Sequence, residues 1–375
     1  DRIDQPLGDE LRTTLRSVGA ADFESGRIRG DGSIFALSRK TNASFSALND
    51  VLSRGGTAGL ARDTIETVNG IEPGAIIVRG LERETLQTIL EDNRIDAVAL
   101  GEAPAATSLN AARVGIYRPW GGNQYDAGWT RWVLEQYGFN PGSVYDSDVR
   151  NGDLAKRYDT ILVPDLAASR PLRKADLEAR MQELGIPEPY RRKGPLGVLL
   201  DGLSPLEVPE SYAGGIGDKG GEMLRRFVWE GGSLVALNKA SEAIIDLFEL
   251  PVTNVLRGLD SNEFSCAGAL LQIELADPAA ATGGLPDRPA VMFAGGPAFQ
   301  TKAGFDGKVL ARFAEADSLL LSGVIIGPEK IQGKSAALEV SYGQGRIYLF
   351  GFKPQWRGQS HGTYKMLFNL LYRQG

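Results

Sequence analysis

The stretch Tyr212–Ser241, YAGGIGDKGGEMLRRFVWEGGSLVALNKAS, decides the fold that we expect for this chain. It reads as a glycine-rich loop, a helix ending at Gly231–Gly232, a buried strand, and a sharp turn into another helix. In open α/β sheets such a turn presents one side chain at the carboxyl end of a strand, where ligands bind. Asn238 is that side chain here, and the amides of residues 213–217 are candidate donors to an anion.

The same alternation of apolar, β-branched runs with amphipathic stretches extends along the whole chain, which is typical of an α/β protein. The predicted strands are Ile34–Leu37, Ala75–Val78, Ala97–Leu100, Val114–Tyr117, Thr160–Val163, Ser233–Leu237, Leu270–Leu275, Val291–Phe293 and Leu319–Ile325, followed by a hairpin of Ala337–Ser341 with Arg346–Phe350. One predicted helix starts near Asn42 and stops at Gly55–Gly56, and another passes through Trp129, Trp132, Val133 and Tyr137. The other predicted helices are Arg83–Leu90, Lys174–Leu184, Glu222–Trp229 and a final one from about Thr363 to Leu371.

The segment Glu102–Ser108, EAPAATS, is the best candidate for a linker, because it contains small residues and proline and has no periodicity. We therefore expect two domains. Residues 1–108 would form a small α/β connector domain, and residues 109–375 would form the larger α/β domain.

Composition excludes several classes of protein. Of the 375 residues, 42% are hydrophobic and 23% are charged, as in ordinary soluble globular proteins. No apolar run approaches the roughly 18–20 residues that cross a bilayer, and the net charge of −6 argues against nucleic acid as a partner. The single Cys266 and single His361 exclude an intrachain disulfide, a cysteine-based zinc site and a histidine-rich metal centre. No cofactor or metal is expected in this chain, and its start at Asp1 suggests a processed or trimmed product.

Two segments resemble the motifs of class I glutamine amidotransferases. In that family one strand runs into a Gly-x-Cys-x-Gly turn, and a later strand leads into Gly-Phe-His-Pro-Glu. The corresponding segments here are LVALNKA, residues 234–240, and GRIYLFGFKPQ, residues 345–355. The resemblance implies a flavodoxin-like, mostly parallel sheet with flanking helices. It places Asn238, Lys353 and Gln355 at the positions of the nucleophile, the base and the carboxylate that orients the base.

None of these three replacements can perform the family's chemistry. A carboxamide is not a nucleophile, and lysine is protonated near neutral pH unless burial lowers its pKa by several units. Glutamine carries no charge to stabilise a cation, and Cys266 does not lie at the turn, so we interpret it as a small buried hydrophobe. We expect no amidotransferase activity.

A second resemblance covers most of the chain. Residues 113–139, 158–165, 211–217, 231–241 and 345–372, with SIFALSRKTNASFSALNDVLSRGG near the start, are similar to the C-terminal, non-peptidase region of large bacterial zinc carboxypeptidases. Such enzymes bind zinc through His-x-x-Glu and a distant histidine, and this chain has no such motif. The resemblance therefore implies a covalently linked peptidase domain upstream, which would hold the zinc, and an extracytoplasmic or secreted location.

Three functions remain open. The first is a non-catalytic accessory region of a zinc carboxypeptidase-type protein. The second is a free-standing binding module for a small carboxylate, an amide or a peptide, and the third is an enzyme of different chemistry that uses Asp165, His361 or Lys353. The oligomeric state is left undefined. The candidate ligand-binding residues are Trp120, Asn123, Tyr212, Gly214, Gly215, Lys239, Arg357 and His361, each of which also has a purely structural interpretation as a turn glycine, a packed ring or a solvated cation.

Overall fold

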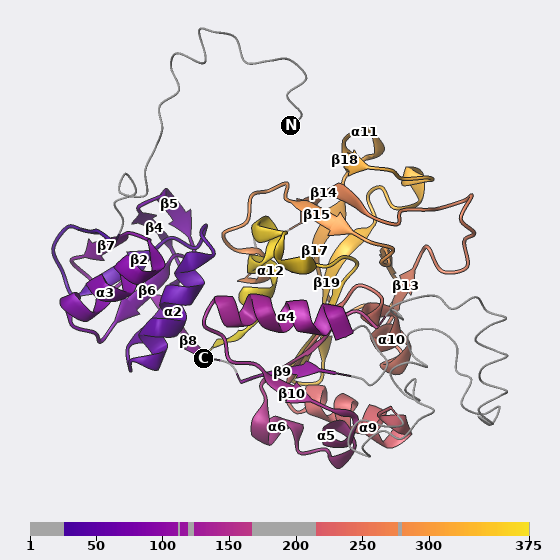
Figure 1. Ribbon diagram of the computed structural model, residues 1–375, viewed down its shortest axis with the longest axis horizontal. Helices are drawn as coiled ribbons and strands as arrows, with labels where there is room; N and C mark the ends of the chain where they lie inside the picture. Colours follow the sequence, from indigo (N-terminus) through magenta and orange to yellow (C-terminus); the bar gives the residue numbers. More distant parts are fainter. Residues whose placement is uncertain (1–25, 112, 119–123, 167–214, 277–279, 375) are drawn as a thin grey trace, which may run out of the picture.

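The computed structural model describes residues 26–111, 113–118, 124–166, 215–276 and 280–374. These residues form an N-terminal unit beside a larger unit that is built on a long sheet (Figure 1). The predicted helix Lys174–Leu184 lies outside the described residues.

A parallel sheet forms the centre of the larger unit, and its strand order is β10-β9-β11-β12-β20. In chain order this is 2-1-3-4-5, the order of the flavodoxin-like fold. The chain therefore has the α/β fold that its sequence predicts. The strands are β9 (Val114–Tyr117), β10 (Gly142–Val144), β11 (Thr160–Val163), β12 (Ser233–Leu237) and β20 (Gly345–Phe350).

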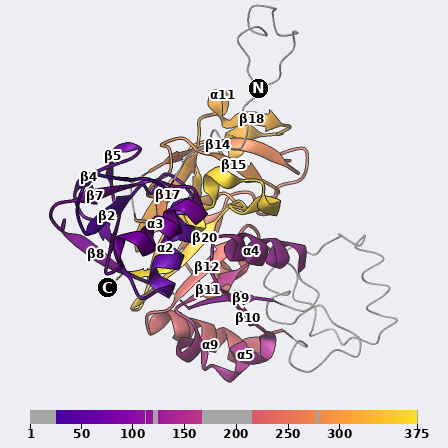
Figure 2. The same cartoon turned by 60° about the vertical axis from the view of Figure 1, so that its left-hand side comes forward.

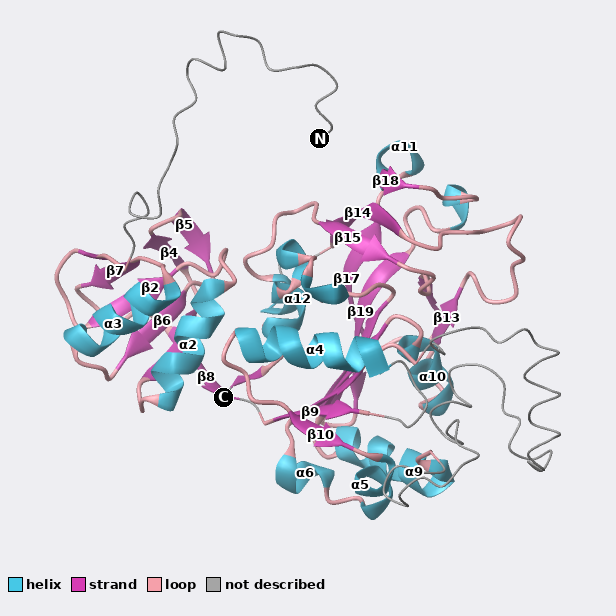
Figure 3. Ribbon diagram, in the orientation of Figure 1, coloured by secondary structure: helices cyan, strands magenta, loops and turns pink. Residues whose placement is uncertain are grey.

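Helices cover both faces of this sheet (Figure 3). Because side chains alternate along a strand, Leu162 and Val235 join the core beneath α4 and α12, whereas Ile161 and Leu234 pack toward α5, α9 and α10. The helices are α4 (Gln124–Gln136), α5 (Asp146–Asn151), α6 (Leu154–Arg157), α9 (Gly217–Trp229), α10 (Ala240–Leu247) and α12 (Lys365–Phe368).

Antiparallel strands extend the sheet beyond β20. The predicted hairpin is confirmed, since β19 pairs with β20 around Tyr342 and Gly345. The remaining elements of this extension are β13 (Val252–Asn254), β14 (Ala269–Leu275), η4 (Ala280–Thr282), β15 (Ala290–Phe293), β16 (Phe299–Thr301), β17 (Gly307–Phe313), α11 (Ala316–Leu319), β18 (Leu320–Gly323), η5 (Pro328–Lys330) and β19 (Ser335–Tyr342). Two short turns, η6 (Trp356–Gly358) and η7 (His361–Thr363), precede α12, which is shorter than the predicted final helix.

The N-terminal unit is a second sheet of order β1-β7-β2-β6-β3-β8-β21 with two helices and a separate β4–β5 hairpin. Its elements are β1 (Ile28–Arg29), β2 (Ile34–Leu37), α2 (Ala43–Ser53), β3 (Thr57–Ala61), β4 (Thr64–Thr67), β5 (Gly70–Pro73), β6 (Ile76–Arg79), α3 (Arg83–Asn93), β7 (Ala97–Leu100), β8 (Ala106–Ala111) and β21 (Tyr372–Gln374).

The predicted linker Glu102–Ser108 is wrong in its second half, because β8 begins at Ala106. This strand has few large apolar side chains, so its sequence pattern is weak. Main-chain pairing holds it instead, with β3 on one side and β21 on the other. The last strand of the chain thus completes the sheet of the first unit, and the expected boundary at residue 108 falls inside β8.

The two units lie side by side (Figure 2), and aromatic packing joins them. The ring of Phe368 in α12 lies 5.5 Å from Phe45 of α2 and 5.2 Å from Phe139. Polar contacts cross the same junction, since Arg39 Nε donates to Asn369 Oδ1 at 3.0 Å. The N-terminal unit is therefore packed on the larger unit through a shared core.

We expect the substitution Phe368→Ala to lower the free energy of unfolding by about 3–5 kcal/mol, because it leaves a cavity where the two units meet. Urea denaturation measures this change. The matched control is Leu321→Ala, since the Leu321 side chain is 49% exposed and its removal should cost little. A loss below about 1 kcal/mol for Phe368→Ala would contradict the shared core.

Candidate functional site

The turn that follows β12 holds Asn238 in an unusual backbone conformation. Its φ angle is +54°, in the left-handed region that asparagine enters more readily than most residues. The Ser241 amide donates to the Asn238 carbonyl at 3.0 Å as the chain enters α10. The strand, the sharp turn and the helix are those predicted, and Asn238 is the residue at the turn.

A loop from the antiparallel extension closes over this side chain. Asn238 Nδ2 donates to the Ala294 carbonyl at 3.4 Å, and among the described residues Asn238 Oδ1 is buried without a hydrogen-bond partner. A Cβ atom on Gly296 would lie 2.3 Å from Oδ1 and 2.1 Å from the Gly351 carbonyl oxygen. Only glycine fits at position 296, and Asn238 is fully buried beneath it.

The Lys353 ammonium lies between two buried carboxylates at the carboxyl edge of the sheet. Lys353 Nζ is 2.6 Å from Asp165 Oδ2 and 3.6 Å from Asp126 Oδ1. Lys353 follows β20, Asp165 follows β11, and Asp126 lies in the first turn of α4. All three side chains are less than 10% exposed. Burial raises the pKa of Asp126, and the nearby Lys353 charge opposes that rise.

Gln355 joins the same cluster. Its Nε2 atom donates to Asp126 Oδ2 at 3.3 Å and to Thr130 Oγ1 at 3.0 Å. The Asp165 main-chain amide also donates to Asp126 Oδ2, at 2.9 Å. The structure therefore brings Lys353 and Gln355 together on Asp126, whereas the side-chain amide of Asn238 bonds to the loop that covers it.

Another buried carboxylate, that of Asp146, lies at the carboxyl ends of β9 and β10. Tyr117 Oη donates to Asp146 Oδ1 at 2.7 Å. Burial raises the pKa of Asp146 to about 6, against the opposing effects of Tyr117, of the Arg150 charge and of a hydrogen bond from the Gly215 amide. The Gly215 carbonyl in turn accepts from Arg150. Gly215, predicted as an amide donor to a ligand anion, thus serves a carboxylate of the protein itself.

The other predicted ligand-binding residues are dispersed. Arg357 is exposed, with its guanidinium 4.7 Å from the centre of the Trp356 ring. The His361 ring lies 5.0 Å from that of Tyr364, and its carbonyl accepts from the α2 cap residue Asn42. Lys239 is partly buried at the start of α10. Four further candidates lie outside the described residues: Trp120, Asn123, Tyr212 and Gly214.

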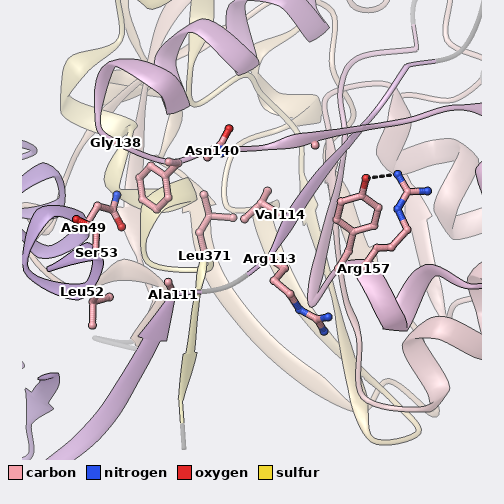
Figure 4. A pocket seen from close by; sticks show the side chains of 13 residues that line it. Asn49, Leu52, Ser53, Ala111, Arg113, Val114, Gly138, Asn140, Arg157 and Leu371 are labelled. Carbon is pink, nitrogen blue, oxygen red and sulfur yellow. Dashed lines mark hydrogen bonds between the residues drawn. The ribbon is translucent and has the colours of Figure 1, made fainter. Parts of the chain in front are cut away.

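Two neighbouring cavities lie at the opposite, amino edge of the sheet. One, of about 630 Å³, opens between α2 and the start of β9 (Figure 4). The other, of about 670 Å³, reaches the starts of β11, β12 and β20. The arginines beside the first cavity already have carboxylate partners, Arg113 with Asp159 and Arg157 with Asp148. A ligand anion would have to displace these ion pairs.

Asp126, Asp146 and Thr130 were not predicted from the sequence. An aspartate in the first turn of a helix is common, because it interacts favourably with the helix dipole, so Asp126 and Asp146 gave no distinct signal. Of the residues named for a different chemistry, Lys353 and Asp165 do form a pair. Within the described ranges, no group of three or more histidine, cysteine, aspartate or glutamate side chains could hold a metal ion.

The comparisons with known proteins give weak likenesses only. No family model matches the chain, and no curated protein matches it. A putative GMP synthase protein from Thermoplasma acidophilum superimposes with a TM-score of 0.40 and 12% identity, over 69% of this chain and 92% of that one. A putative ThuA-like protein from Bacteroides uniformis superimposes with a TM-score of 0.34 and 11% identity, over 72% of this chain and 93% of that one. A β-galactosidase from Bacillus circulans sp. alkalophilus superimposes with a TM-score of 0.37 and 10% identity, over 69% of this chain and 31% of that one.

Each of these TM-scores is below 0.5, so we take the fold from the strand order of the chain itself. None of the helices that the structure describes is both long and apolar enough to cross a bilayer.

We expect Lys353→Met to lower the free energy of unfolding by about 3–5 kcal/mol at neutral pH, because it leaves Asp126 and Asp165 buried without their ammonium partner. Urea denaturation of the variant measures the loss. Lys330→Met is the control, since the Lys330 side chain is 40% exposed and pairs with an exposed Glu329. Equal stability of the two variants would contradict a buried ion pair.

The raised pKa of Asp146 predicts a pH dependence of stability. The folded state binds the proton of the Asp146 carboxyl group more tightly than the unfolded state does. The contribution of this group to the free energy of unfolding is therefore present at low pH and is lost as pH rises from about 4 to about 6. A rise in pKa from 3.8 to about 6 corresponds to about 3 kcal/mol over that window. Asp146→Asn should remove this part of the decline in unfolding titrations. A variant with the wild-type slope would show that Asp146 is not its source.

Proposed function

We infer that this chain is a non-catalytic accessory module with a flavodoxin-like fold. One observation carries the proposal: Lys353 Nζ lies 2.6 Å from Asp165 in a site where both side chains are buried. Lys353, the residue at the position of the amidotransferase base, thus forms an internal ion pair. A buried, ion-paired cluster stands where that family has its reactive centre.

The neighbouring positions support the same proposal. A general base must reach the proton that it removes, and a nucleophile must reach its substrate. Asn238 has no exposed surface, and the loop around Gly296 covers it. Gln355 is also fully buried, and its Nε2 atom donates hydrogen bonds to Asp126 and Thr130. These contacts favour a structural role for the edge that other α/β proteins use for binding.

We further propose that the module acts beside a zinc carboxypeptidase-type peptidase domain. It is supported by the sequence blocks that are similar to the non-peptidase region of those enzymes. In this role the module would stabilise the peptidase domain or present substrate to it. Zinc would belong to that upstream domain.

Exposed aromatic side chains on α4 offer a surface for such a partner. Tyr125, Trp129 and Trp132 are 76%, 37% and 46% exposed. Their spacing of four and three residues places them on one face of the helix. Large exposed aromatic groups gathered on one face are a common feature of protein interfaces.

We expect the purified chain to hydrolyse glutamine at the background rate, because the nucleophile position is occupied by the fully buried carboxamide of Asn238. The assay measures ammonia release, with Asn238→Ala as a matched variant that should give the same rate. Turnover above background that Asn238→Ala abolishes would overturn the proposal, since it would place chemistry at the turn after β12.

A further inference from the structure

The contact between Lys353 and Asp165 brings an amine nitrogen next to a carboxyl group, the two groups that an amide bond joins. Lys353 Nζ lies 2.6 Å from Asp165 Oδ2, and this oxygen is bonded to the carboxyl carbon. Their side chains are 7% and 3% exposed. Asp126 Oδ1 lies 3.6 Å from the same Nζ atom. We propose that Lys353 Nζ and the Asp165 carboxyl carbon form an intramolecular amide bond, with Asp126 as the group that moves the protons.

Other lysine ion pairs in the described part of the chain differ clearly from this one. The lysine side chains that pair with Glu72, Asp153 and Glu329 are 49%, 77% and 40% exposed. Water surrounds those ammonium groups and keeps them solvated. Among these described pairs, only that of Lys353 has both partners shielded and a second carboxylate within 4 Å of the ammonium.

Burial makes the condensation favourable at this site. Two charges removed from water carry a desolvation cost that their attraction offsets only in part. An amide is neutral, so its formation removes both charges from the interior. The fold also holds the two reacting groups in contact, which replaces a bimolecular encounter by an intramolecular one.

The step balances without any further reactant. The Lys353 ammonium transfers one proton to the Asp165 carboxylate, which gives a neutral amine and a neutral carboxyl group. Nζ then attacks the carboxyl carbon, and a nitrogen–carbon bond forms. A second proton passes from nitrogen to a hydroxyl oxygen, the carbon–oxygen bond breaks, and one water molecule leaves. Nζ keeps one hydrogen, and the other two leave on the oxygen that Asp165 loses.

Asp126 is placed to carry the second proton. Its Oδ2 atom is fixed by the Asp165 amide at 2.9 Å and by Gln355 Nε2 at 3.3 Å, which leaves Oδ1 facing Lys353 Nζ. The Oδ1 atom of this carboxylate can accept a proton from nitrogen and then pass it to the departing oxygen, and burial, which raises the pKa of Asp126, favours its uptake of that proton. Its own protonation state is the same before and after the reaction.

The bond would tie together two strands that are not neighbours. Lys353 follows β20 and Asp165 follows β11, and β12 lies between these strands in the sheet. The amide would therefore cross the carboxyl edge of the sheet in front of the Asn238 turn. This inference goes beyond the accessory role and does not depend on it, since a glutaminase assay cannot report the bond.

The test is the intact mass of the full chain under denaturing conditions. We expect wild-type protein to be lighter than its sequence by the mass of one water molecule. Protease digestion should then yield a branched species in which the peptide that contains Lys353 is joined to the peptide that contains Asp165. Unmodified mass in the folded, purified protein after prolonged incubation would overturn the proposal.

Variants locate the reaction and identify its catalyst. Asp165→Ala and Asp126→Ala should both have their full sequence masses, the first because it lacks the carboxyl group and the second because it lacks the proton carrier. Lys365→Met is the matched control, since Lys365 is also a buried lysine but its Nζ atom lies 3.5 Å from the neutral side chain of Asn42. This control should still lose one water molecule, and a full-mass Lys365→Met protein that is folded would count against the assignment.

A second route to water loss must give a different result. An aspartate followed by glycine can lose water by cyclising on its own backbone, and this chain has such pairs at Asp31, Asp201 and Asp306. Cyclisation joins no two peptides, and alkaline treatment reverses it. A mass deficit that disappears on such treatment, without a branched peptide, would overturn the proposal.

Discussion

The attraction of one ammonium for two buried carboxylates organises the carboxyl edge of the sheet. Lys353 draws together the end of β20, the end of β11 and the first turn of α4, through Asp165 and Asp126. Gln355 and the Asp165 main chain then complete the hydrogen bonding of Asp126. Because a charge in the interior requires a partner, none of these groups can move independently. The edge that is open for ligands in related folds is filled by the protein's own side chains.

Four of the five central strands could be predicted closely from the sequence, because each is a short run of mainly apolar residues, whereas β10 (Gly142–Val144) was missed because GSV has too few apolar residues to form a pattern. Thr160–Val163 and Ser233–Leu237 form β11 and β12 with the predicted bounds. The flavodoxin-like class also followed from the turn at Asn238 and from the family resemblance that the turn suggested. Local pattern is informative here because buried parallel strands are apolar on both faces.

Long-range pairing could not be predicted in the same way. β8 has a mixed, weakly apolar sequence, and it is a strand because β3 and β21 bond to its main chain from residues distant in the sequence. The Lys353 cluster has the same origin, since Asp126, Asp165 and Lys353 are far apart along the chain. Lys353 and Gln355 were singled out as degenerate positions, yet their common partner Asp126 resembled any acidic residue at the start of a helix.

The pairing of β21 with β8 has a consequence for the order of assembly during synthesis. Residues 372–374 are synthesised long after the other strands of the sheet that they complete, which lie between residues 28 and 111. Until β21 has been synthesised, β8 is therefore an exposed edge, and exposed edges pair readily with other chains. A polypeptide that lacks residues 372–374 keeps this exposed edge, and the pairing of β21 with β8 covers it.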